Sequence, residues 1–163
     1  MASLFDSLGP DWRAPDVAEA VRSMAESDAA DRGAVFTRPE IVEAILDLSG
    51  YTSDRRLLDC RLLEPSFGQG DFLLPAVARL LESIRREGNE PSTAVADLMR
   101  AVRAVEIGQE PYTHTKTRLA ALLRSYDISD IDAEALCAQW LICDDFLLCE
   151  LGGSFDIIVG NPP

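Results

Sequence analysis

The sequence predicts an α/β fold, in which a mostly parallel sheet carries helices on both faces. Two observations support this prediction. Four apolar runs of strand length alternate with stretches of helical periodicity, and each run ends in a glycine turn, an acidic residue or a proline corner. The runs are 61–64, 101–106, 140–143 and 155–160. Because ligands of such sheets bind beyond the carboxyl ends of the strands, we expect a binding site at this edge.

The helices are predicted from apolar residues at helical spacing. They cover 15–30, 39–48, 72–86, 91–99, 109–124 and 132–138. Thr37 is expected to cap the helix over 39–48, with Glu40 completing a capping box. The strand over 61–64 runs through a glycine-rich turn into the helix over 72–86, which is the strand-turn-helix unit of a parallel sheet.

The composition limits the classes of protein to consider. With 163 residues, 47% of them hydrophobic, the chain is long enough for one domain or part of one. No apolar run approaches the roughly 20 residues that span a bilayer, and the amino terminus lacks the pattern of a signal peptide, so we expect a cytoplasmic protein with no membrane partner. A net charge of −13 argues against this segment gripping nucleic acid alone, because phosphates are contacted mainly by Lys and Arg.

The cysteines and the histidine do not predict a metal site. Cys60, Cys137, Cys143 and Cys149 form no Cys-x-x-Cys pair, and three of them lie in apolar segments. Small buried thiols are therefore favoured over metal ligands or disulfides. The single histidine, His114, falls in a helical stretch without metal partners in its neighbourhood, which favours a position on the surface.

The last strand runs into Asn161, Pro162 and Pro163, and this corner has a particular chemistry. The prolines donate no backbone hydrogen bonds, and their restricted φ fixes the neighbouring carbonyls. The Asn161 side-chain oxygen and the Pro162 carbonyl can therefore accept hydrogen bonds from one amino group, for example the exocyclic amine of a nucleobase. Asn-Pro also begins ordinary turns, so the corner needs support from the rest of the chain.

The other strand ends supply groups that suit a nucleoside ligand. Gly68 and Gly70 let the backbone turn tightly and approach a ligand. Glu106 ends the second strand, where a carboxylate can accept from both ribose hydroxyls. Asp145 ends the third, where it can accept from an adenine amino group beside the apolar ring of Phe146. Each feature alone is also compatible with an ordinary turn or a solvated charge.

In combination and order, these motifs resemble the amino-terminal half of gamma-class adenine-N6 DNA methyltransferases, which are common in bacterial restriction-modification systems. The resemblance covers about residues 33–163, with 1–32 as a separate amino-terminal helical segment. It implies a partial Rossmann-like, class I methyltransferase sheet. The matching stations are Phe36-Thr37-Arg38-Pro39, Glu64-Pro65-Ser66-Phe67-Gly68-Gln69-Gly70, Glu106, Asp145-Phe146 and Asn161-Pro162-Pro163.

The resemblance implies that S-adenosylmethionine is the cofactor. Thr37 would bind its methionine carboxylate, the loop from Glu64 to Gly70 would wrap the methionine part, and Glu106 would hold the ribose. Asp145 would accept from the adenine amino group. The full cofactor set that the resemblance implies is Phe36, Thr37, Glu64, Pro65, Ser66, Gly68, Gly70, Phe72, Glu106, Ile107, Asp145 and Phe146.

The catalytic residues that the resemblance implies are Asn161, Pro162 and Pro163. Asn161 and Pro162 would hold the target amine in line with the sulfonium methyl group, so that catalysis is mostly orientation and electrostatic pre-organisation. The family continues from this motif into an aromatic residue that stacks on the flipped base, and nothing follows Pro163 here. The stretch from Gly70 to Glu106 is also longer than the usual crossover before the ribose acid.

The resemblance further implies double-stranded DNA as a partner, held by a target-recognition region absent from this chain. The last strand would be left as an open apolar edge, to which a complementary chain or another copy could pair. We favour a fragment of a longer enzyme over a natural half that assembles with a partner, and we expect the chain to be inactive alone. Two alternatives stay open: a fragment of an N5-glutamine protein methyltransferase, which shares the Asn-Pro-Pro motif, and a non-catalytic module that binds S-adenosylmethionine or serves assembly.

Overall fold

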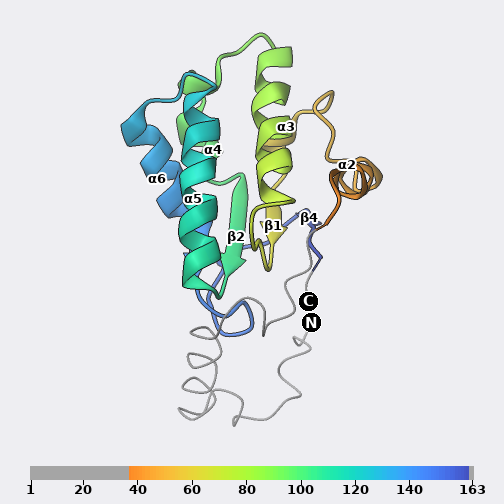
Figure 1. Cartoon of the computed structure of the whole chain (residues 1–163). Coiled ribbons are helices and arrows are strands. Elements are labelled where there is room, and N and C mark those ends of the chain that lie inside the picture. Colours follow the sequence, from red (N-terminus) through yellow and green to blue (C-terminus); the bar gives the residue numbers. More distant parts are fainter. Residues whose placement is uncertain (1–36, 162–163) are drawn as a thin grey trace, which may run out of the picture.

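The structure, a computed structural model, describes residues 37–161 (Figure 1). These residues form a four-stranded sheet on which the helices pack. No helix in this part of the chain combines the length and the apolar character that crossing a bilayer requires. The helix expected over 15–30, the segment 1–32 and the site residues Phe36, Pro162 and Pro163 lie outside the described residues.

The elements follow one another in the alternating order that the sequence predicts. The helices are α2 (Pro39–Leu48), α3 (Leu73–Arg86), α4 (Val95–Leu98), α5 (Gln109–Arg124) and α6 (Asp130–Trp140). Short 3₁₀ helices are η3 (Leu57–Asp59) and η4 (Pro91–Thr93). The strands are β1 (Leu62–Glu64), β2 (Val102–Glu106), β3 (Leu141–Cys143) and β4 (Ile157–Ile158).

The four strands are parallel and lie in the order β3-β2-β1-β4. The chain steps from β1 to β2 to β3 in one direction and then returns to the other side of β1 for β4. This reversal makes the gap between the carboxyl ends of β1 and β4 the topological switch point, where open α/β sheets bind their ligands. The α/β class and the parallel sheet are thus confirmed.

The two faces of the sheet differ in how well the described residues cover them. Leu62 lies beside Val102 and Ile157 in one row across the sheet, and this row packs into the core with α3, α5 and α6. Figure 1 shows α3 and α5 side by side over the strands. The next row contains Leu63 and Ile158, and Ile158 is 63% exposed. Because β1 is central and β4 is an edge, exposure rises toward β4.

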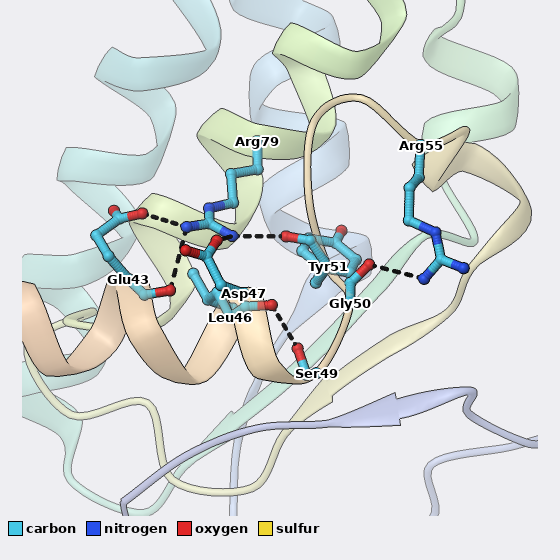
Figure 2. Close-up of polar contacts among 8 residues, drawn as sticks. All are labelled: Glu43, Leu46, Asp47, Ser49, Gly50, Tyr51, Arg55 and Arg79. Carbon is cyan, nitrogen blue, oxygen red and sulfur yellow. Dashed lines mark hydrogen bonds and ion pairs between the residues drawn. The ribbon is translucent and has the colours of Figure 1, made fainter.

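Helix α2 is fastened to α3 by one arginine (Figure 2). The Arg79 guanidinium, on α3, forms ion pairs with Glu43 and, at 2.7 Å, with Asp47, both on α2. It also donates to the Tyr51 carbonyl oxygen over 2.9 Å. The Arg79 side chain is only 15% exposed, and these two carboxylates raise its pKa in opposition to burial. The clamp fixes the position of α2 and hence of Thr37, two residues before it.

Three predicted boundaries are corrected by the structure. The helix over 91–99 is divided into η4 and α4, because the Thr93 hydroxyl donates to the Glu90 carbonyl and competes with continued helix. The helix over 132–138 is longer, beginning at Asp130 behind its cap Ser129. The strand over 155–160 is shorter, because the segment before Ile157 is held by Arg61, whose backbone N–H donates to the Asp156 carboxylate over 2.8 Å.

Candidate functional site

The predicted site residues gather mainly at the carboxyl ends of β1, β2 and β4. Glu64 is the last residue of β1, Glu106 is the last residue of β2, and Asn161 follows β4. Glu64 pairs in register with Ala104, two residues before Glu106, so both carboxylates belong to the same face of the sheet. The topology therefore places them around the switch point.

The loop after β1 is built on two glycines with positive φ. Gly70 has a φ of 82°, and a Cβ there would lie 2.8 Å from the Thr115 methyl group, so the position requires glycine. Gly68 has a φ of 48°, but a Cβ there would meet nothing within 4 Å. The backbone at Gly68 is therefore accessible to a ligand, whereas Gly70 lets the loop pack against α5.

Two side chains of α5 donate hydrogen bonds to carbonyl groups of this loop. The Thr115 hydroxyl donates to the Gly68 carbonyl over 2.8 Å, and the Arg118 guanidinium donates to the Gln69 carbonyl over 2.7 Å. The Phe67 N–H donates to the Val105 carbonyl over 3.0 Å. Within the loop, the Gly70 N–H donates to the Phe67 carbonyl over 2.7 Å. These bonds fix the loop backbone.

Glu106 joins the loop to the end of β2. Its two carboxylate oxygens accept from the Gly68 N–H over 2.8 Å and from the Gly108 N–H over 2.7 Å, and the residue is only 6% exposed. Each carboxylate oxygen has a second lone pair, so the group can still accept from a ligand hydroxyl. Glu106 thus has both a structural function and the acceptor capacity that the sequence predicts.

Glu64 is a buried carboxyl group without a full set of partners. It is 1% exposed, and its Oε2 has no hydrogen-bond partner among the described residues. Burial raises its pKa well above the ordinary value, and the negative charges of Asp71 and Glu106 raise it further. An unpaired carboxyl at a switch point is a strong candidate for ligand contact.

Thr37, Asp71 and Asn161 form a small network that connects three segments. The Thr37 N–H donates to the Asp71 carboxylate over 3.2 Å, and the Asn161 side-chain Nδ2 donates to the Thr37 hydroxyl over 3.3 Å. Residues 124 positions apart are therefore adjacent at the site. Thr37 and Asn161 were both expected in the site, and the structure brings them together.

The expected capping box at Thr37 is wrong. Helix α2 begins at Pro39, so its N-cap is Arg38, which makes no side-chain cap hydrogen bond. Proline suits the first helical position because it lacks an N–H, and this shifts the start of the helix one residue beyond a Thr37 cap. Glu40 then falls at the second helical position rather than the third. The Thr37 hydroxyl is instead used by Asn161.

Asp145 and Phe146 lie in the turn after β3, beyond the end of β2. The neighbouring Asp144 N–H donates to the Glu106 carbonyl over 3.2 Å, which fixes the start of this turn to β2. One Asp145 carboxylate oxygen accepts from the Leu147 N–H over 2.7 Å, and both Asp145 and Phe146 are half-buried. Asp145 therefore orders its own turn and keeps its second oxygen for another donor.

The remaining predicted residues have mixed surroundings. Phe72 is buried at 2% exposure and belongs to the core, while Pro65, Ser66 and Ile107 are half-buried.

Two residues near the site were missed by sequence reasoning. Asp71 directly follows Gly70, so its position in the loop was an available signal, whereas Thr115 carries no local signal because its partner lies 47 residues away.

The cysteines and the histidine have no metal-binding arrangement among residues 37–161. The prediction of buried thiols holds for Cys137 alone, since Cys60 and Cys149 are half-buried and Cys143 is exposed. The apolar residues around Cys143 in the sequence suggested burial, but Cys143 ends the edge strand β3, where little covers it. His114 is exposed on α5, as predicted.

Comparison with known proteins relates this chain to named enzymes. It is 52% identical over 132 residues to the type II methyltransferase M.PaeR7I of Pseudomonas aeruginosa, covering 81% of this chain and 23% of that protein. It is 44% identical over 135 residues to the type II methyltransferase M.BstVI of Geobacillus stearothermophilus, covering 80% and 24% respectively. It is 42% identical over 133 residues to the type II methyltransferase M.XhoI of Xanthomonas vasicola, covering 82% and 24%.

No protein-family model and no solved structure match the chain. The chain spans about a quarter of the length of the curated relatives that it matches. Within that span, identity of 42% or more over about four fifths of the chain is far above chance resemblance. The chain is therefore homologous to a portion of type II methyltransferases.

Proposed function

We propose that this chain is the cofactor-binding part of a DNA methyltransferase that transfers the methyl group of S-adenosylmethionine to the exocyclic N6 of adenine. The observation that carries the proposal is the convergence of Thr37, Glu64, Glu106 and Asn161 at the switch point of a parallel sheet. The homology to type II methyltransferases supports it independently. A restriction-modification setting follows from the relatives' class.

The described residues fit the proposed cofactor. Glu64 offers a buried carboxyl oxygen without a partner, which suits a cationic group. Gly68 leaves open space beside the backbone, and Glu106 retains acceptor capacity for ribose hydroxyls. When bound, S-adenosylmethionine supplies an electrophilic methyl group on a positively charged sulfur. The protein's contribution is to orient and to exclude water, which are large effects in group transfer.

The Asn161 side chain is oriented to accept a hydrogen bond from the amine that receives the methyl group. Its Nδ2 donates to the Thr37 hydroxyl over 3.3 Å, which directs the amide oxygen toward other donors. A target amino group could donate to that oxygen and, by the resemblance, to the Pro162 carbonyl. Two hydrogen bonds to one nitrogen would hold it in position for attack, which is the orientation effect expected of this corner. Thr37 therefore positions the Asn161 side chain that would hold the target amine, besides its proposed contact with the cofactor carboxylate.

The proposed grip on DNA belongs to other parts of the enzyme. The charge of −13 makes this segment a poor phosphate binder, and the relatives are about four times as long as the matched region. We therefore infer that turnover requires a target-recognition region beyond this segment. The protein-methylating alternative has no support from the relatives' class, and a non-catalytic module would retain the cofactor site alone.

Calorimetric titration of the chain with S-adenosylmethionine tests the proposal. Wild type is expected to bind, and Asp145→Ala and Glu106→Gln are expected to weaken binding by at least roughly tenfold, since each removes a charged acceptor. Asp97→Ala is the matched control, because Asp97 is an exposed acid on α4, away from the strand ends. Absence of binding by the folded wild type would refute the cofactor assignment.

Methyl transfer is measured separately. Labelled methyl groups should not pass from S-adenosylmethionine to adenine-containing duplex DNA with this chain alone. They should do so with the complete enzyme, and Asn161→Ala in that enzyme should abolish transfer while cofactor binding persists. Transfer to a protein glutamine, or none by the complete enzyme, would favour the alternatives.

A further inference from the structure

We propose that Glu64 is a specificity-determining residue that gives up a proton when the charged methyl donor binds, and so makes the site prefer the donor over its product. The inference rests on the proposed function and extends it. S-adenosylmethionine carries a methyl group, and with it a positive charge, on a sulfur that is neutral in S-adenosylhomocysteine, and the rest of the two molecules is alike. A residue that senses this one charge would favour loading of the donor and release of the product.

The geometry places the Glu64 carboxyl group inside the proposed cofactor site. It ends the central strand β1 at the switch point, between the ends of β2 and β4. On the β4 side, a Cβ on Gly160 would lie 3.9 Å from the Glu64 Cγ, so the two strand ends are in close contact. The glycine loop begins just after Glu64, and Oε2 has no partner within residues 37–161. A ligand in the loop is therefore the available source of a partner.

Burial and the charges around Glu64 favour its protonated form while no cation is present. The titratable groups that act on it are Asp71, in the glycine loop, and Glu106, at the end of β2, and both are acids. The β4 side presents Gly160, which carries no charge. Burial and these two acids raise the pKa of Glu64, in that order. A carboxylate there would be both desolvated and repelled, so the neutral form is the stable one.

A bound cation reverses this balance. A positive charge within about 4–6 Å stabilises a carboxylate by roughly one to three pKa units. The Glu64 proton then passes to the solvent, and the newly formed carboxylate pairs with the cation. The product lacks the sulfonium charge, so it stabilises the carboxylate less and releases less of the proton. Both molecules carry the same amino and carboxylate groups, so comparison between them isolates the methyl group and the charge on the sulfur.

The test is calorimetry of the folded chain between pH 5.5 and pH 7, in buffers with different enthalpies of ionisation. For wild type we expect proton release on binding S-adenosylmethionine and measurably less on binding S-adenosylhomocysteine. Affinity for the donor should rise with pH, by at most about tenfold per pH unit for one proton. Affinity for the product should rise less.

Glu64→Gln is the decisive variant, because the amide resembles the neutral carboxyl and should leave the fold intact. It should abolish the extra proton release and lower the donor-to-product affinity ratio by at least roughly tenfold. Glu110→Gln, which removes an exposed acid from the first turn of α5, should leave both quantities unchanged. Circular dichroism checks that each variant is folded, and the wild-type proton release tests the inference without any variant.

The outcomes separate the inference from the proposed function. If wild type binds the donor, but proton release is equal for donor and product or survives in Glu64→Gln, the inference is wrong and the cofactor site stands. If wild type binds neither molecule, both the inference and the proposed function are wrong.

Discussion

At the scale of single residues, two glycines of one loop have different surroundings and so different functions. Gly70 is required by packing, because a Cβ would collide with Thr115 and Leu74. A Cβ on Gly68 would meet nothing within 4 Å, so only the positive φ of this residue favours glycine. The sequence alone treats the two as equivalent turn glycines. Their difference depends on α5, because the Thr115 methyl group lies close to where a Cβ of Gly70 would be, whereas at Gly68 the Thr115 hydroxyl contacts only the carbonyl oxygen.

Gly70→Ala is expected to destabilise the protein more than Gly88→Ala. Both glycines have a φ near 80°, so both substitutions carry a left-handed penalty of about 1–2 kcal/mol. Only Gly70 adds a Cβ contact at 2.8 Å, whereas nothing lies within 4 Å at Gly88. Overpacking costs about 1–3 kcal/mol more. Urea unfolding measures both free energies, and equal losses would contradict the packing argument.

At the scale of elements, the Arg79 clamp determines where α2 lies. Two carboxylates and two backbone carbonyls accept from one half-buried guanidinium, and Thr37 lies two residues before the helix that they hold. The clamp therefore contributes to the site without touching it. It was not predicted, because Arg79 is separated from Glu43 by 36 residues and nothing local marks the pair.

Arg79→Ala is expected to destabilise the chain by about 1–3 kcal/mol, since it removes charge-assisted bonds and leaves the Tyr51 carbonyl without this donor. Hydrogen exchange should accelerate more in α2 than in α5, because only α2 depends on the clamp. Arg56→Ala is the matched control, with an expected loss within about 0.5 kcal/mol, because the Arg56–Asp59 pair is exposed. A uniform increase in exchange across both helices would show that the clamp has no local effect.

The sequence predicted elements well where the signal is local, and contacts poorly where it is not. The bounds of α2 and α5 match the predicted ranges, because Pro39 marks one start and apolar periodicity marks both helices. The positions of Glu64 and Glu106 at the ends of predicted strands also predicted that the two residues lie near each other, at the carboxyl ends of the strands. The sequence could not show that the Asn161 amide meets the Thr37 hydroxyl, since that contact depends on the order of the strands.

At the scale of the whole molecule, the described part of the sheet has two edge strands, β3 and β4, and β4 carries an exposed isoleucine. Strand β4 pairs with β1 and with no other described strand, and Ile158 is 63% exposed on it. An exposed apolar edge strand favours pairing with another chain. The sequence-based expectation of a complementary chain or a second copy at this edge stays a prediction, and one substitution tests it.

Ile158→Lys should reduce self-association of the isolated chain, because a charge on an edge strand opposes pairing. The free energy of unfolding should change by about 0.5 kcal/mol or less, as for other surface substitutions. Ile131→Lys is the control, since Ile131 is 83% exposed but lies on α6. Sedimentation velocity over a range of concentrations measures association. Equal effects of the two substitutions would mean that general hydrophobicity, rather than the β4 edge, drives association.

The titration of Glu64 should contribute to the pH dependence of the whole molecule's stability. Its pKa is raised in the folded protein, so between the unfolded value of about 4.3 and the higher folded value the native state binds more protons than the unfolded state. The contribution of Glu64 to the free energy of unfolding is therefore fully present below about pH 4.3 and is lost as the pH rises through the folded pKa. The usual native carboxylate, with a lowered pKa, has the opposite sign.

Glu64→Gln should remove this loss, because the amide cannot ionise. Relative to wild type, the variant is expected to gain stability as the pH rises from about 4.3 toward neutrality. Urea unfolding of both proteins across this range gives the difference in free energy at each pH. Acids that do not interact with Glu64 cancel in the subtraction, so the difference reports Glu64 and its interactions with Asp71 and Glu106. A flat difference would mean that Glu64 titrates alike in the folded and unfolded states. A rising difference would show that the cofactor-free fold bears the cost of a buried acid, which a bound cation would relieve.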